Sequence, residues 1–148
     1  MKSLYANMER WRPYVLSILR IVVALLFLEH GLSKVFGFPT PGPQHLHGLI
    51  ILAAFLETVG SALLLLGVYT RVVALILSGQ MALAYFMAHA PRGFFPLVNG
   101  GQLAILFCFV FLYLAFAGGG AWSLDRAVLR QDRARRQTSP YPQLATVP

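Results

Sequence analysis

The chain alternates long apolar runs with short breaks that are rich in glycine and proline. Four runs, at about 14–33, 49–66, 71–90 and 101–117, each approach the ~20 apolar residues that a helix needs to cross a bilayer. Polar residues are few within the runs and gather in the breaks and at the two ends of the chain. The pattern predicts an all-α polytopic membrane protein built as a four-transmembrane-helix bundle.

The breaks themselves indicate where helices begin and end. Pro13 precedes the first run, and proline suits the first position of a helix. The segment 37–43 holds three prolines and two glycines and cannot continue a helix. Gly67 can take the left-handed closing position of the second helix, and Thr70 can cap the third. The second and third runs are therefore predicted to form a tight helical hairpin.

The distribution of lysine and arginine predicts the orientation. Basic residues gather before the first run, between the second and third, and after the fourth, which places these segments on the cytoplasmic side. Residues 1–13 are then a cytoplasmic segment, and 121–148 are a basic cytoplasmic tail that we expect to be disordered after Thr138. Both termini are cytoplasmic, and the chain lies in a bacterial inner membrane. The basic residues of these segments are Lys2, Arg10, Arg12, Arg71, Arg126, Arg130, Arg133, Arg135 and Arg136. The other two loops hold only Lys34 and Arg92, and Arg20 lies within the first run.

Composition excludes several classes of protein. The chain is 57% hydrophobic and 11% charged, with a mean hydropathy of +0.66, well outside the range of soluble domains. The net charge of +7 sits at the chain ends, which favours an anionic membrane surface over nucleic acid as its partner. Cys108 is the single cysteine, so an internal disulfide is impossible, and redox chemistry would need a cofactor. The sequence also lacks a phosphate-binding loop and hydrolase or protease motifs.

Glu57 is the most informative polar residue because it lies about eight residues, or roughly 12 Å, into its predicted span. An ionisable side chain at that depth costs roughly 2.5–3.5 kcal/mol and normally faces the bundle interior. One interpretation pairs it with Arg20 of the first span. The alternative is that Arg20 extends to the inner interface while Glu57 is protonated and hydrogen-bonded to a neighbouring helix.

Other polar residues fall at the outer level of the predicted spans, above Glu57. A pocket open to the outer face is one interpretation; the other is that residues at helix ends meet water and headgroups, which we expect of Lys34 and Asn99. Both interpretations stay open for His89. The candidate pocket comprises Arg20, Glu29, His30, Glu57, Tyr85, His89 and Gln102.

His45 and His47 form a weak candidate for metal ligation in the loop after the first run. Their spacing is compatible with a metal site, and other histidines are expected at the same level. However, two histidines in a loop rich in proline and glycine usually serve only as soluble polar residues. We therefore assign no metal.

Several stretches together resemble the DoxX family of small bacterial membrane proteins over nearly the whole chain. Arg20 with the later stretch 31–37 is similar to the family's first-helix pattern. The family's second-helix pattern is similar to the stretches 57–60 and 66–71. The same order continues with Met81, Ala84, His89 and 93–94. The family's C-terminal signature is similar to 99–101 together with 118–125. Gln102 departs from the pattern, because relatives often carry glutamate there, and this puts a proton-handling role for that position in doubt.

The resemblance implies a four-helix membrane bundle associated with redox physiology through membrane quinones and oxidative-stress partners. It favours an accessory subunit of a quinone-linked oxidoreductase, working with a soluble redox partner. His89, Tyr85, Arg20 and Glu57 would then bond the quinone oxygens and exchange protons. The alternative is a small-solute carrier, or a scaffold that docks a soluble partner through 126–136. The sequence leaves homo-oligomer formation open.

Overall fold

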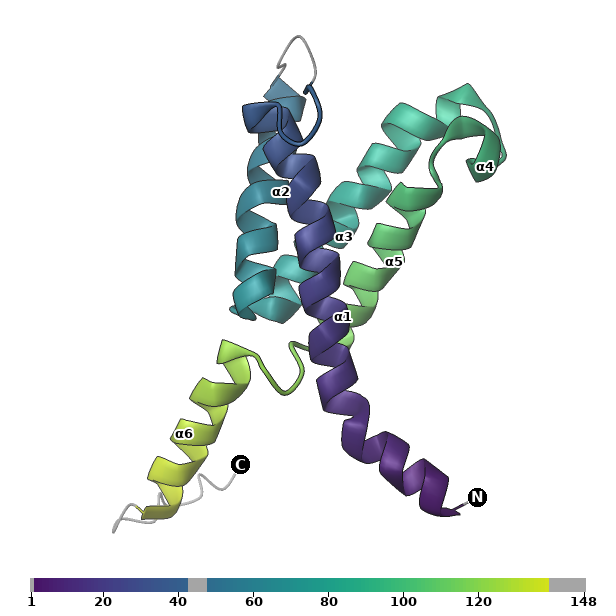
Figure 1. Ribbon diagram of the computed structural model, residues 1–148. Helices are drawn as coiled ribbons and strands as arrows, with labels where there is room; N and C mark the ends of the chain where they lie inside the picture. The colour runs from purple at the N-terminus through teal and green to yellow at the C-terminus, as the bar shows by residue number, and fades with distance from the viewer. Residues whose placement is uncertain (1, 43–47, 139–148) are drawn as a thin grey trace, which may run out of the picture.

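A computed structural model describes residues 2–42 and 48–138, and all regular structure within these ranges is helical (Figure 1). The predicted all-α class is therefore confirmed for the described residues. The histidines considered for metal ligation, His45 and His47, and the tail after Thr138 that was expected to be disordered lie outside the described residues.

The first helix, α1 (Lys2–Phe36), is 35 residues long and contains Pro13 in its interior. The prediction that a helix begins just after Pro13 is wrong, because α1 begins at Lys2. Proline removes only the backbone bond to the carbonyl four residues earlier, at Glu9, and Glu9 is exposed, so water can satisfy that carbonyl. The carbonyl of Pro13 itself accepts bonds from Ser17 Oγ at 3.0 Å and from the amide of Ala121 at 2.9 Å.

The hairpin predicted between the second and third runs is present as α2 (Gly48–Leu66) and α3 (Thr70–Ala84). Gly67 takes the left-handed conformation with a φ of 70°, and its amide bonds the carbonyl of Leu64 at 3.0 Å. Thr70 does not cap α3 as predicted. The hydroxyl of Thr70 is buried with no partner, and the capping group comes from a distant segment described below.

The third predicted span changes character before it ends. After Ala84 the chain forms a π-helical turn, η1 (Tyr85–His89), and a 3₁₀ turn, η2 (Ala90–Arg92). A short α4 (Pro96–Asn99) leads to α5 (Gln102–Ala117), and α6 (Leu124–Thr138) completes the described chain.

The helices pack in two pairs, α1 with α2 and α3 with α5. The start of α1 and the whole of α6 lie at one end of the molecule, and α4 lies at the other (Figure 1). Close approach depends on small residues, since a side chain on Gly60 would lie 2.9 Å from Leu77. The buried core is apolar and aromatic and includes Phe27, Leu64, Leu77, Phe107, Phe111 and Leu114.

Three helical segments in the described ranges are long and apolar enough to cross a membrane: Leu4–Phe36, Gly48–Leu66 and Thr70–Arg92. The fourth predicted span, α5, is apolar but has 16 residues, or about 24 Å. Large apolar side chains on the outer faces are about half exposed, Ile51 at 54% and Leu75 at 56%. Such faces suit contact with lipid rather than water.

Candidate functional site

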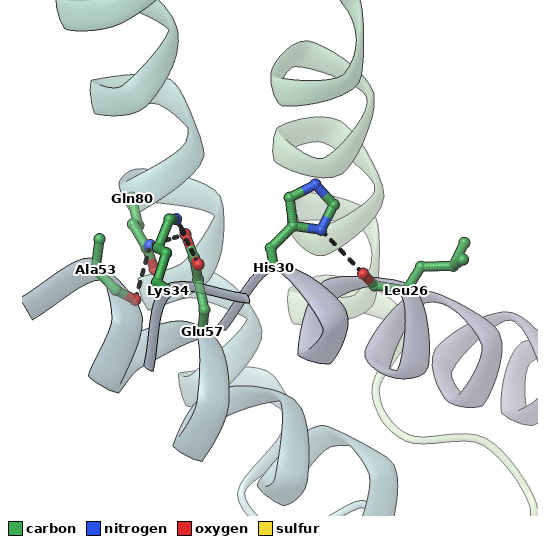
Figure 2. A network of polar contacts seen from close by, with 6 residues as sticks. All are labelled: Leu26, His30, Lys34, Ala53, Glu57 and Gln80. Atoms are coloured by element: carbon green, nitrogen blue, oxygen red, sulfur yellow. Dashed lines mark hydrogen bonds and ion pairs between the residues drawn. The ribbon is translucent and has the colours of Figure 1, made fainter. Parts of the chain in front are cut away.

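Glu57 lies at the centre of a buried cluster built from three helices (Figure 2). Only 2% of its surface is exposed. Lys34 Nζ of α1 donates to both carboxylate oxygens at 2.5 Å, and Gln80 Nε2 of α3 donates to Glu57 Oε1 at 3.1 Å. We call Lys34, Glu57 and Gln80 the carboxylate cluster. In this cluster, two hydrogen-bond donors hold a carboxylate deep among apolar helices.

Small residues one helical turn away bring these three side chains together. A side chain on Gly31 would lie 2.8 Å from the amide nitrogen of Thr58, so glycine lets α1 approach α2 closely, and Lys34 follows one turn later. Gly60 in turn receives the side chain of Leu77, and Gln80 lies one turn after Leu77 on the same face of α3. The same small residues that pack the helices therefore set the register of the cluster.

The cluster has hydrogen-bonding capacity to spare. Gln80 Oε1 is buried with no partner, although buried polar atoms are normally satisfied. The side chain of Lys34 is 28% exposed while that of Glu57 is 2% exposed, so the ammonium group links the buried carboxylate to the protein surface. The arrangement can donate hydrogen bonds to an oxygen placed beside the carboxylate.

Arg20 does not pair with Glu57, and that predicted ion pair is wrong. Its guanidinium is fully buried and donates to the carbonyls of Leu65 at 2.8 Å, Gly119 at 2.9 Å and Trp122 at 3.0 Å, and also to the carbonyl of Leu64. The C-terminal carbonyls of a helix carry partial negative charge, which a guanidinium neutralises. Arg20 is 14 residues, or about 21 Å, from Lys34 along α1, so it belongs to a separate structural site.

Asp125 completes this end of the molecule and was not predicted as a site residue. Its Oδ1 accepts the amide of Tyr69 and its Oδ2 the amide of Thr70, both at 2.8 Å. The carboxylate thus caps α3 from the start of α6. The sequence signal was Ser-Leu-Asp at 123–125, shortly after the triple glycine at 118–120, because serine before an apolar residue is typical of a helix start. The hydrogen bonds of Arg20 and Asp125 together connect α1, α2, α3 and α6.

His89 and Tyr85 lie in the π-helical turn and do not bond to the carboxylate cluster. Their rings stack with centroids 6.4 Å apart and planes 17° apart. His89 Nδ1 donates to the carbonyl of Asn99 at 3.1 Å. Asn99 is buried and bonds the carbonyl of Gly93 and the amide of Gly101, each at 2.8 Å. The sequence predicted that Asn99 meets water and headgroups at a helix end. Instead, Asn99 orders the loop before α5.

The remaining predicted pocket residues do not join the cluster. Glu29, His30 and Gln102 are exposed. His30 Nδ1 donates to the carbonyl of Leu26 at 3.0 Å, and Figure 2 shows its ring apart from the contacts of the carboxylate cluster. The ring packs 5.7 Å from that of Phe107.

Lys34, expected to meet water and headgroups at a helix end, instead holds the buried carboxylate. Gln80 was not singled out at all. The sequence feature that could have identified Gln80 is its position, because it is an amide side chain in the middle of an apolar run. Among the described residues, no group of three or more His, Cys, Asp or Glu could hold a metal ion.

Comparison with known proteins identifies relatives across most of the chain. The DoxX family profile matches residues 15–90. An uncharacterized protein of Haemophilus influenzae is 46% identical over 84% of this chain and 98% of its own length. A second one from the same organism is 31% identical over 76% of this chain and 82% of its own length.

An uncharacterized membrane protein of Mycobacterium tuberculosis is 30% identical over 82% of this chain and 85% of its own length. No solved structure matches the chain. The extent of the family match and the apolar helices lead to one conclusion, which confirms the resemblance found in the sequence: the chain belongs to the DoxX family of membrane proteins.

Proposed function

We propose that this protein is a redox-associated subunit of the bacterial inner membrane that binds a quinone at the carboxylate cluster. The observation that carries the proposal is a nearly fully buried carboxylate, Glu57, held by two donors in the middle of an apolar helix. Glu57 is the tenth residue of α2, or about 14 Å from its start, near the midplane of a ~30 Å core. Ionisable groups at that depth mark functional pathways.

The proposed topology has four crossings with both termini in the cytoplasm. Arg10 and Arg12 precede the apolar part of α1, and Arg126 and Arg130 follow α5. Two ends rich in arginine on one side agree with the rule that cytoplasmic segments are positive. The crossing by α5 is short at about 24 Å and is accommodated by local thinning of the bilayer.

The chemistry of the cluster fits a quinone headgroup. A quinone presents carbonyl oxygens, and when bound it accepts two electrons, here from a soluble redox partner, and two protons. Lys34 and Gln80 supply donors for such an oxygen, and Glu57 can hold a proton beside it. The unpartnered Gln80 Oε1 can accept a hydrogen bond from a hydroxyl group. A ligand with carbonyl or hydroxyl oxygens therefore meets both hydrogen-bond donors and an acceptor at the carboxylate cluster.

Quinone content tests this proposal. Wild-type protein, Glu57→Gln and the control Glu29→Gln are purified gently from membranes, and quinone is extracted and quantified by mass spectrometry. Glu29 is a suitable control because it is an exposed glutamate on α1. We expect near-stoichiometric quinone in the wild type and in Glu29→Gln, with a loss of about tenfold in Glu57→Gln. Equal trace amounts in all three would refute a quinone site.

A scaffold or a small-solute carrier is the alternative function. The observation that favours a scaffold is α6, which leaves the helix pairs as a separate arm (Figure 1) with Leu129 59% exposed. A scaffold predicts that Glu57→Gln is functionally silent while removal of 126–136 is not. A carrier predicts uptake of a solute into proteoliposomes that is lost in Glu57→Gln.

A further inference from the structure

A large groove lies at the end of the molecule that carries α6, remote from the carboxylate cluster. Its volume is about 1000 Å³. Its walls come from α1, the turn between α2 and α3, the start of α3, the end of α5, the triple glycine and α6. No step in the proposed quinone chemistry uses this groove.

Three arginines line the groove: Arg12 from α1, Arg71 from α3 and Arg126 from α6. Asp125 is the one carboxylate among the lining residues. Both of its oxygens already accept the amides of Tyr69 and Thr70, so its charge is engaged with the start of α3. Arg12 Nη1 also lies 3.4 Å from Glu9 Oε2, but both side chains are exposed, and an exposed ion pair is weak. The groove therefore stays positive and is suited to an anion, most strongly to a phosphate group, which arginine binds well.

The rest of the lining is apolar, which a free inorganic anion would not require. Leu16 and Val72 contribute from the helix pairs, and Leu124, Val128 and Leu129 contribute from α6. Val128 is 56% exposed and Leu129 is 59% exposed, although α6 is otherwise rich in charge. A ligand with a phosphate and hydrocarbon chains would neutralise the arginines and cover these side chains together.

An aromatic cluster places the groove at the level of lipid headgroups. The rings of Trp11 and Tyr14 lie 5.7 Å apart, and those of Tyr14 and Trp122 lie 5.8 Å apart. Trp11 and Trp122 are 59% and 57% exposed. Tryptophan and tyrosine gather at the membrane–water interface, and these residues neighbour Arg12 and the triple glycine in the sequence.

We propose that this groove binds one anionic phospholipid, with its phosphate at Arg12, Arg71 and Arg126 and the upper acyl chains against α6. Basic pockets at helix ends are a known mode of binding acidic headgroups. The site needs only that this end of the protein lies in a leaflet containing anionic lipid, so it does not depend on the quinone proposal. Bound lipid would fix α6 against the helix pairs.

Native mass spectrometry in detergent tests the proposal with phosphatidylglycerol and phosphatidylcholine as probes. The groove variant is Arg71→Gln with Arg126→Gln. The control is Arg10→Gln with Arg130→Gln, which removes the same charge from the same end but outside the groove lining. We expect one phosphatidylglycerol to be retained by the wild type and the control. Its affinity should fall about tenfold in the groove variant, and phosphatidylcholine should bind weakly to all three.

Equal weakening in the groove and control variants would overturn the proposal, because the lipid would then respond to diffuse charge. Equal binding of both lipids to the wild type would overturn it too, because the arginines would then not select the headgroup. Arg71 Nη1 also lies 3.5 Å from the carbonyl of Ala115, so its replacement can disturb α5. A second variant, Arg12→Gln with Arg126→Gln, leaves that contact intact and must show the same selective loss.

Discussion

Replacing Lys34 with methionine should destabilise the protein more than replacing Glu57 with leucine, although both changes break the same ion pair. The reason is the difference in exposure, 28% for the side chain of Lys34 against 2% for that of Glu57. Lys34→Met leaves a buried carboxylate with Gln80 as its remaining donor among the contacts described. Glu57→Leu leaves an ammonium that can turn toward water or headgroups.

The magnitudes follow from what each variant leaves behind. Removing one partner of a buried ion pair costs about 3–5 kcal/mol, and partial exposure of Lys34 puts Lys34→Met near the lower end, at about 3 kcal/mol. Glu57→Leu should cost about 1–2 kcal/mol, including the lost bond from Gln80. The double variant removes both charges and should lie within about 1 kcal/mol of the wild type. The coupling between the two sites is then about 3–5 kcal/mol, the sum of the single losses minus the loss of the double variant.

Reversible unfolding in mixed micelles, with increasing dodecyl sulfate and helix content followed by circular dichroism, measures all four proteins. A double variant whose loss equals the sum of the single losses, within about 0.5 kcal/mol, would show that the pair is not coupled. Equal losses in the two single variants would refute the argument from exposure.

Three further predictions concern the end of the molecule that holds Arg20, and the same unfolding measurement checks each. Arg20→Lys should lower the free energy of unfolding by about 3 kcal/mol, because an ammonium cannot reach carbonyls on both sides of the guanidinium. An unchanged free energy of unfolding would refute the structural role of these bonds. Asp125→Asn should cost about 1 kcal/mol by weakening the cap of α3, whereas the exposed Glu9→Gln should change stability by less than about 0.5 kcal/mol. Gly67→Ala should cost more than Gly37→Ala, although both have positive φ. An added Cβ lies 2.6 Å from Ser123 Cβ at Gly67 and meets nothing within 4 Å at Gly37; equal losses would show that this contact relaxes.

Much of the helical layout could be predicted because bilayer-length apolar runs and proline-rich breaks are local signals. The predicted bounds 49–66 and 101–117 differ by one residue at one end from α2 (Gly48–Leu66) and α5 (Gln102–Ala117). The start of α1 was missed because proline penalises a helix interior only locally, and the exposed turn around Glu9 tolerates the loss. The π-helical turn at Tyr85–His89 was not predicted, because such turns are rare inside helices.

The site was only partly predictable, because helix register does not follow from one sequence. The depth of Glu57 identified it correctly as a buried residue, but its partner depends on which residues of α1 lie beside α2. Arg20 was chosen for its charge, whereas the close packing at Gly31 brings Lys34 level with Glu57.

The most direct test of the central claim is the reduced-minus-oxidised infrared difference spectrum of the wild type with bound quinone, compared with Glu57→Gln loaded with the same quinone. If Glu57 exchanges a proton with the ligand, reduction should change a carboxylic acid C=O band in the wild type. That band should be absent from the variant while the quinone bands remain in both. Identical carboxyl bands in the two proteins would contradict a role for Glu57 in quinone chemistry.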